Sequence, residues 1–274
     1  MKRIKITVAY DGTDFCGWQL QSGVRTVQGE LEGAIARITG SPVRAHGSGR
    51  TDSGVHALGQ VVHFDVDARR ASVPWQQALN SLLPDDITVL DCEHVSDEFH
   101  SRFSALRKSY TYSLWLNNSF FLPWRRRFVW KCGPLDLDAL DRGMAFFQGE
   151  HDFASFQNTG TTVSSTVRTI FEFSRQSGET EHEILLRVCG SGFLKQMVRN
   201  MIGCLVEIGR GKAEPDSVRS LLQMKDRTLA PATAPAQGLC LEGVYYGENG
   251  CGGPDAGRQQ PDTQGGLNSE VRPA

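Results

Sequence analysis

The sequence predicts an α+β protein in which two ferredoxin-like halves of βαββαβ order join into one long, mixed and largely antiparallel sheet with a central cleft. Three observations predict this fold class. Several segments alternate apolar and polar residues as half-buried strands do, others repeat apolar residues at helical spacing, and both kinds follow the same order twice along the chain. That order is the split βαβ unit, which packs helices on one face of an antiparallel sheet and leaves the other face free for a ligand.

The N-terminal half is predicted to span residues 1–105 and begins with a strand. In residues 3–10, apolar positions alternate with Arg, Lys and Thr, which is typical of a strand with one buried face. A helix is predicted from Thr26 to Gly40, because apolar residues recur at spacings of three and four and Gly40 can end the helix. The remaining elements predicted for this half are strands at 42–47 and 60–66, a helix at 73–83 with Ser72 as its N-cap, and a strand at 87–92.

The C-terminal half is predicted to span residues 106–247 and repeats this order. Its predicted elements are strands at 107–116, 166–174, 183–189 and 241–246, and helices at 136–148 and 193–209. Residues 228–240 are rich in Ala, Pro and Thr and form either an ordered excursion or a mobile loop. Residues 248–274 have too few apolar side chains to offset the entropy of ordering them, and therefore predict a disordered tail.

Composition is that of an ordinary globular protein, and the expected location is cytoplasmic. Of 274 residues, 39% are hydrophobic, yet no apolar run is long enough to cross a bilayer and no secretory signal pattern opens the chain. Cysteines and histidines lack the spacing of metal ligands, so no metal is expected. The net charge of −2 does not indicate a polyanion partner. Basic clusters at 125–127 and at Arg102, Arg107 and Lys108 do so locally, although a solvated surface explains each cluster equally well.

The most informative segment is the glycine-rich connection at 47–57, between two predicted strands. It reads Gly-Ser-Gly-Arg-Thr-Asp-Ser-Gly-Val-His-Ala. Its glycines allow a ligand to approach the backbone closely while Arg50 and Asp52 are presented to it, so a catalytic carboxylate beside a cation is one interpretation. A glycine-rich hairpin with an Asx turn is the other, and the spacing alone favours it.

Two further segments carry candidate site residues. Tyr110 and Tyr112 share one face of the strand at 107–116, where a tyrosine either completes the core or stacks on a base. In the helix predicted at 193–209, Lys195 and Arg199 are one turn apart. Arg199 lies among apolar neighbours and needs a partner if it is buried, and Asp52 is the predicted partner.

These segments together resemble the tRNA pseudouridine synthase A family. The resemblance is collinear over about residues 4–246, and the Gly-Arg-Thr-Asp loop is its most specific piece. The other matching pieces are Tyr-Asp-Gly-Thr at 10–13, Gly-Trp-Gln at 17–19, Thr-Val-Gln-Gly at 26–29, Phe-His-Ser-Arg-Phe at 99–103, Lys-x-Tyr-x-Tyr at 108–112, His-Asp-Phe at 151–153, Phe-Leu-x-x-Met-Val-Arg-Asn at 193–200 and Ala-Pro-Ala-Gln-Gly-Leu at 234–239. The tail is longer than the family needs.

The resemblance implies the pseudouridine synthase fold and a role for each candidate residue. Asp52 is implied as the catalytic aspartate, with Arg50 beside it. Tyr110 is implied as the active-site tyrosine that stacks on the base and takes the proton from C5, and Arg199 as the cation that keeps Asp52 ionised. Leu239 is implied as a substrate-binding residue.

The implied reaction is isomerisation of uridine to pseudouridine at positions 38, 39 and 40 of the tRNA anticodon stem-loop, by a homodimer and without a cofactor. Asp52 either attacks the ribose or assists formation of a reactive sugar intermediate, and the target base leaves the helical stack, with Arg50 filling the space. A non-catalytic RNA-binding protein on the same fold is the alternative. It has no use for a carboxylate facing RNA, so Asp52 favours the enzyme. Hydrolysis of small nucleosides is disfavoured by the basic clusters and the large sheet.

Overall fold

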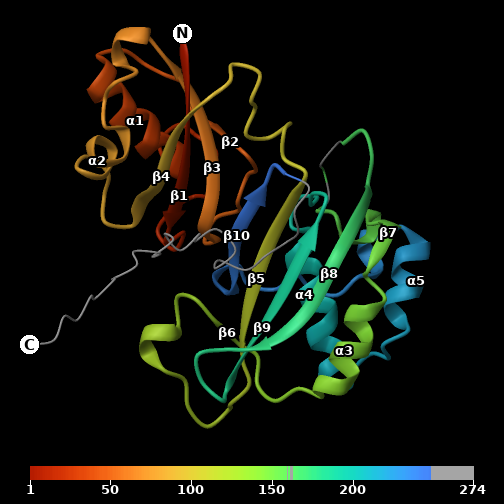
Figure 1. The fold of residues 1–274 in the computed structure, drawn as a ribbon. Helices are drawn as coiled ribbons and strands as arrows, with labels where there is room; N and C mark the ends of the chain where they lie inside the picture. The colour runs from red at the N-terminus through yellow and green to blue at the C-terminus, as the bar shows by residue number, and fades with distance from the viewer. Residues whose placement is uncertain (159, 161–162, 248–274) are drawn as a thin grey trace, which may run out of the picture.

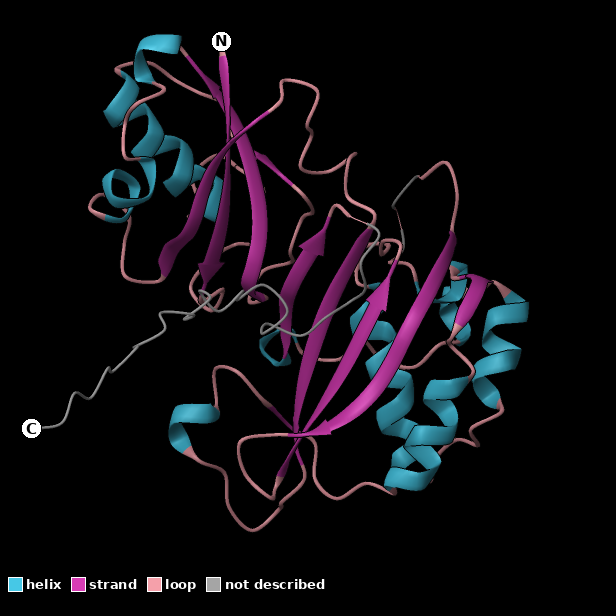
Figure 2. Ribbon diagram, in the orientation of Figure 1, coloured by secondary structure: helices cyan, strands magenta, loops and turns pink. Residues whose placement is uncertain are grey.

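The computed structural model describes residues 1–158, 160 and 163–247, so the tail predicted at 248–274 lies outside the described residues (Figure 1). The described chain forms a ten-stranded sheet with helices packed against it (Figure 2). The strands are β1 (Lys2–Tyr10), β2 (His46–Gly47), β3 (His56–Val66), β4 (Ile87–Val95), β5 (Arg107–Trp115), β6 (Trp130–Lys131), β7 (Gly149–Asp152), β8 (Val167–Ser177), β9 (Glu183–Gly190) and β10 (Leu239–Tyr245). The α-helices are α1 (Val27–Thr39), α2 (Trp75–Asn80), α3 (Leu137–Ala145), α4 (Met197–Gly209) and α5 (Ser217–Met224).

The two halves meet at β10, in the middle of the sheet. The strand order is β4-β1-β3-β10-β5-β9-β8-β7, with β2 beside β3 and β6 beside β5. Strand β10 runs parallel to β3 and antiparallel to β5, and every other pair except β5 with β6 is antiparallel. This mixed, largely antiparallel sheet confirms the predicted fold class. The division into halves at 105 and 106 stays a prediction.

Local sequence explains the best-predicted elements. Strand β1 buries every second residue, from Ile4 to Tyr10. Helix α1 begins after Thr26, whose side chain accepts a hydrogen bond from the Gly29 N–H, and it ends at Gly40, which adopts the left-handed conformation at φ 77°. The predicted start and end of this helix are therefore confirmed.

Other predicted boundaries were wrong. The strand at 42–47 shrinks to His46–Gly47, and α2 has Pro74 rather than Ser72 at its N-cap position, with no side-chain cap. Helix α4 begins at Met197 instead of 193, because Gln196 takes a left-handed conformation at φ 60°. Lys195 therefore lies in the turn before the helix, and not on the helix with Arg199. Strands β6 and β7, helix α5 and the 3₁₀ turns had not been predicted.

Residues 228–240 form an ordered excursion that packs on α4. Ala234 donates its N–H to the Arg199 carbonyl, and Gly203 of α4 lies so close to Ala232 that a Cβ atom would stand 2.1 Å from its carbonyl oxygen. Two 3₁₀ turns, Arg227–Leu229 and Ala236–Gly238, shape the segment. The excursion thus connects α5 to the start of β10.

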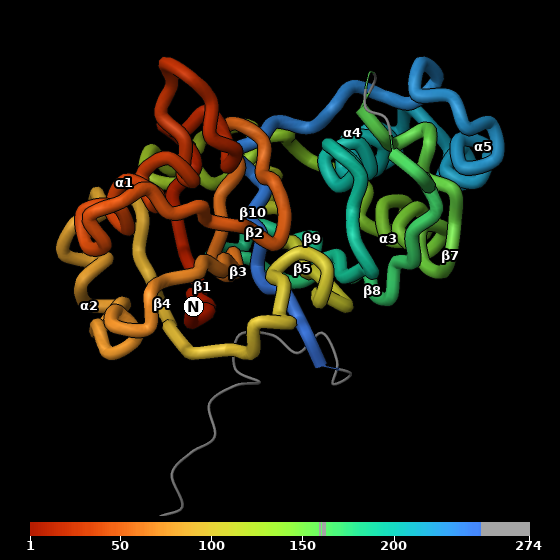
Figure 3. Tube along the Cα trace, turned by 90° about the horizontal axis from the view of Figure 1, so that it is seen from above, coloured from red at the N-terminus to blue at the C-terminus, as the bar shows by residue number. Residues whose placement is uncertain are grey.

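The ligand-facing side of the sheet differs from the expected one. Side chains two residues apart on a strand share a face, so Lys108, Tyr110 and Tyr112 of β5 lie on one face of the sheet. This face is the one covered by α4, because the Tyr112 hydroxyl donates to the carbonyl of Pro235, which lies beside that helix. Helices α1 and α4 lie on the same side of the sheet (Figure 3). The opposite face carries Arg187 paired with Glu172 and Glu242. The prediction that the ligand binds on the face of the sheet without helices is therefore wrong.

Among the described residues, no helix is long and apolar enough to cross a membrane. No group of three or more His, Cys, Asp or Glu in the same part of the chain could hold a metal ion. The absence of a metal stays a prediction.

Candidate active site

The loop that carries Asp52 is fixed on both sides of this residue by the segment between β1 and α1. Thr51 accepts the Trp18 N–H at 3.1 Å through its carbonyl, and its hydroxyl bonds the Tyr10 hydroxyl at 2.8 Å. Ser53 donates its hydroxyl to the Phe15 carbonyl at 3.0 Å. Because Thr51 and Ser53 are held, the Asp52 carboxylate between them has a defined direction.

Close approach of the two segments depends on Gly17. It adopts φ 86°, and a Cβ atom there would stand 2.8 Å from the Thr51 carbonyl oxygen. Any other residue would meet both backbone strain and a steric clash at this position. Gly17 therefore explains why the matching Gly-Trp-Gln piece lies next to the Asp52 loop.

Asp52 forms an ion pair with Arg199 of α4. The Nη1 of Arg199 lies 3.0 Å from Oδ2 of Asp52, and its Nε donates to the Ala234 carbonyl at 2.8 Å. Both side chains are partly buried, with exposed fractions of 14% for Arg199 and 25% for Asp52. The predicted pair is present, although the two residues are 147 positions apart in sequence.

The topology brings the other candidate residues to the same place. Leu239 is the first residue of β10 and lies opposite Tyr112 of β5, while Leu241, two residues further along β10, pairs with Tyr110. The ring of Tyr110 packs edge-on against Phe193 at 5.2 Å. Arg50, Asp52, Tyr110, Arg199 and Leu239 all line one cleft of about 1270 Å³.

Tyr110 is a buried tyrosine whose hydroxyl keeps its proton at neutral pH in the free protein. Burial raises the pKa of its hydroxyl far above the usual value, and the charge of Asp52 raises it further. At neutral pH it is therefore a neutral phenol, which is a weak base. The expectation that Tyr110 takes the C5 proton stays a prediction, and its position in the cleft agrees with contact to a base.

The cleft is strongly basic even though the chain as a whole is slightly acidic. Among the described residues, its lining contains seven Lys and Arg side chains and one carboxylate, that of Asp52. Arg44 pairs with Glu32 and Arg199 with Asp52. The other five have no carboxylate within ion-pair distance among the described residues, namely Arg50, Arg102, Lys108, Arg168 and Lys195. Unpaired cations lining one cleft are expected where a polyanion binds.

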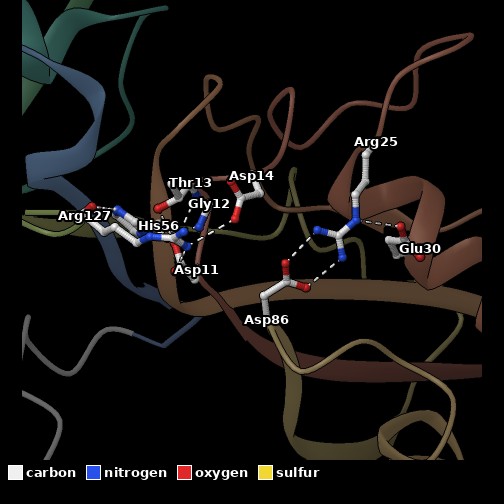
Figure 4. Close-up of polar contacts among 9 residues, drawn as sticks. All are labelled: Asp11, Gly12, Thr13, Asp14, Arg25, Glu30, His56, Asp86 and Arg127. Carbon is white, nitrogen blue, oxygen red and sulfur yellow. Dashed lines mark hydrogen bonds and ion pairs between the residues drawn. The ribbon is translucent and has the colours of Figure 1, made fainter. Parts of the chain in front are cut away.

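A second polar network supports the far end of the Asp52 loop (Figure 4). His56 accepts the Gly12 N–H at Nδ1 and contacts the Arg127 carbonyl through Nε2 at 2.9 Å. Burial lowers the pKa of His56, while the Asp11 carboxylate, 3.2 Å from Nδ1, acts in the opposite direction. The ring thus joins the Asp11-Gly12 turn to the segment before β6.

The basic cluster at 125–127 lies outside the cleft. Arg125 pairs with Glu179 and with Glu183, whose side chain is fully buried, and Arg127 pairs with Asp11 and Asp14. Arg125, partly buried beside Glu183, fits neither interpretation considered for this cluster, whereas Arg127 is exposed, as the solvated-surface interpretation predicts. These two side chains hold the segment before β6 against other parts of the fold.

Replacing Arg125 by Ala is therefore expected to reduce the free energy of unfolding by about 3 kcal/mol, since the buried Glu183 carboxylate loses its partner. Denaturant unfolding measures this change. Arg126→Ala is the matched control, because Arg126 is exposed and should shift the free energy by less than about 0.5 kcal/mol. Equal effects of the two substitutions would contradict the structural role of Arg125.

Several cleft residues could not be singled out from the sequence. Lys108 and Arg102 belonged to a predicted basic cluster and do line the cleft, whereas Arg107 stacks over Phe171 instead. Arg44 and Arg168 carried no signal, because isolated cations in strand-like segments are ordinary surface residues. Only the fold shows that they face the same cleft.

The fold and the cleft define a protein that holds one carboxylate, among its described residues, inside a strongly basic site. Comparison with known proteins identifies its family. A family model described as tRNA pseudouridine synthase matches residues 6–104 and 144–247. The chain belongs to the tRNA pseudouridine synthase family.

Relatives named tRNA pseudouridine synthase A match over nearly the whole chain. That of Maridesulfovibrio salexigens is 74% identical, covering 98% of this chain and 100% of the relative. That of Solidesulfovibrio magneticus is 54% identical, covering 92% and 94%. That of Geobacillus kaustophilus is 44% identical, covering 89% and 95%. The pseudouridine synthase fold implied by the resemblance is confirmed by this membership.

Proposed function

We propose that this protein converts uridine to pseudouridine at positions 38, 39 and 40 of the tRNA anticodon stem-loop, with Asp52 as the catalytic carboxylate. Membership of the family makes the chain an isomerase that acts on uridine in tRNA. Two statements go beyond this membership and are our proposals: the choice of the three tRNA positions, and the catalytic role of Asp52. The single observation that carries the role of Asp52 is that, in the part of the chain that the structure describes, it is the one carboxylate in a cleft with seven Lys and Arg side chains.

The chemistry requires a group at C1′ of the ribose. The N1–C1′ bond breaks, the uracil turns over, the C5–C1′ bond forms, and the proton lost from C5 is balanced by one gained at N1. A carboxylate beside C1′ stabilises the positive charge that develops there as the first bond breaks. The Asp52 carboxylate points into the cleft from a fixed loop and suits this task. No redox change accompanies the reaction.

The other cleft residues support this step. The guanidinium of Arg199 pairs with Asp52 at 3.0 Å and holds its carboxylate in position. Tyr110 stacks on the uracil, and Leu239 bounds the pocket beside it. Arg50 is exposed next to Asp52 and has no carboxylate partner among the described residues, so it is placed to fill the space left when the nucleotide leaves the stack.

We also infer that the active form is a homodimer in which both subunits contact one tRNA. The resemblance to the family supports this inference. Light scattering of the free protein should give twice the mass of the 30.2 kDa chain.

Incubation of the purified protein with unmodified tRNA transcripts tests the proposed function. A transcript with uridine at 38, 39 and 40 should acquire pseudouridine at those positions, and a matched transcript with cytidine there should acquire none. Pseudouridine at other positions of the transcript would contradict the proposed specificity. Tight binding without any pseudouridine would support the non-catalytic RNA-binding alternative instead.

A further inference from the structure

Lys108 is a cation at the floor of the cleft that the proposed chemistry does not use. It stands on β5 two residues before Tyr110 and on the same face of the sheet. Its ammonium donates a hydrogen bond to the Ser48 carbonyl at 2.6 Å. Gly49 leaves room for this contact, because a Cβ atom there would stand 3.1 Å from Nζ of Lys108.

The charge of Lys108 is not balanced within the described chain. No carboxylate there lies within ion-pair distance of it, whereas Lys5, Lys212 and Lys225 each pair with an acid. An ammonium has three donors, and Ser48 accepts one of them. Removing such a cation from water without a partner is costly, and burial accordingly lowers the pKa of Lys108 to about 8.

Arg102 makes the imbalance larger. It lines the same cleft, its guanidinium lies over the Phe103 ring, and its charge lowers the pKa of Lys108 further. Arg102 likewise has no carboxylate partner in the part of the chain that the structure describes. Two neighbouring cations with free donors on one wall of a cleft are a binding site for an anion that brings its own charge.

We propose that Lys108 and Arg102 together bind a phosphate of the RNA backbone next to the nucleotide that faces Asp52. The assignment rests on the proposed function, since it takes the occupant of the cleft to be RNA. Lys108 holds the loop at Ser48, four residues before Asp52, and its remaining donors reach the phosphate. The same side chain therefore links the position of the RNA backbone to that of the catalytic loop.

The salt dependence of tRNA binding tests this site. All proteins carry Asp52→Asn so that binding is measured without turnover, and dissociation constants are taken over a series of salt concentrations. Lys108→Met should weaken binding about tenfold. It should also lower the slope of log Kd against log salt by about 0.7–0.9, which is the contribution of one phosphate contact. Lys108→Arg should keep nearly the full slope, because it retains the charge.

Lys131→Met is the matched control. Lys131 also donates to one backbone carbonyl, that of Asn118, but it is exposed and does not line the cleft. Its replacement should leave the slope unchanged. An unchanged slope in Lys108→Met would overturn the phosphate site. Binding that is insensitive to salt in the parent protein would instead overturn the proposed function.

A second measurement needs no substitution at Lys108. Because phosphate binds the charged ammonium and Lys108 loses its proton near pH 8 in the free protein, tRNA affinity should fall as the pH rises through 8. The charged and titratable side chains that line the cleft with Lys108 are Cys16, Arg44, His46, Arg50, Asp52, His100, Arg102, Tyr110, Arg168, Lys195 and Arg199. Arg102 is the one among them that shifts the pKa of Lys108. Affinity that is constant between pH 7 and 9 would contradict the site even if Lys108→Met failed to fold.

Discussion

The Asp52→Asn protein is expected to bind tRNA normally and to form pseudouridine at least about 10⁴-fold more slowly than wild type. Asparagine keeps the size of the side chain and one oxygen that can still accept from Arg199, but it removes the negative charge that the C1′ step requires. Single-turnover formation of pseudouridine, measured with enzyme in excess over transcript, reports the chemical step directly.

The control for this experiment is the dissociation constant of the same variant. Thr51 and Ser53 hold the loop by contacts that do not involve the Asp52 side chain, so the fold and the basic lining of the cleft should survive. A rate within tenfold of wild type would show that another group performs the step. Lost binding with lost activity would point to a collapsed loop.

Arg199→Met is expected to have the second-largest effect, a loss of activity of roughly 10²-fold. The substitution removes the cation that contacts Asp52 and leaves the Ala234 carbonyl without its side-chain donor. The folded protein then holds a partly buried carboxylate without its partner. The rate at saturating tRNA should fall more than the affinity does, because Arg199 acts through Asp52 rather than through the RNA backbone.

A double-mutant cycle in denaturant unfolding isolates the pair from the RNA. The costs of Arg199→Met and Asp52→Asn should differ from additivity by about 1 kcal/mol, reduced from the value of a fully buried pair because a quarter of the Asp52 side chain is exposed. Strictly additive costs would mean that the two side chains do not stabilise each other. Arg199 would then be assigned to a phosphate.

The sequence was sufficient for the fold because its local signals agreed with one another. The alternation in β1 and the spacing and caps of α1 act within a few residues, so both elements were predicted nearly to their ends. Strand β6 and helix α5 are short and were missed. The start of α4 was misplaced because the left-handed conformation of Gln196 is set by its surroundings and not by residue type.

Site residues that belong to a recognisable motif could be predicted from the sequence. Residues whose role depends on ion pairs with distant parts of the chain could not. Asp52, Tyr110 and Arg199 lie in segments with recognisable patterns, and even the partner of Arg199 followed from its apolar neighbours. Arg125 and Lys108 were equally basic in sequence. The first is neutralised by Glu183, 58 positions away, whereas the second is left for a ligand, and only the fold distinguishes them.

The most direct measurement of the central claim is a pseudouridine map, at nucleotide resolution, of tRNA from cells that lack this protein and carry it again as wild type or as Asp52→Asn. Pseudouridine at positions 38, 39 and 40 should be absent without the protein, return with the wild type and stay absent with Asp52→Asn present at equal abundance. Return of the modification with Asp52→Asn, or an unchanged map in cells lacking the protein, would contradict the account.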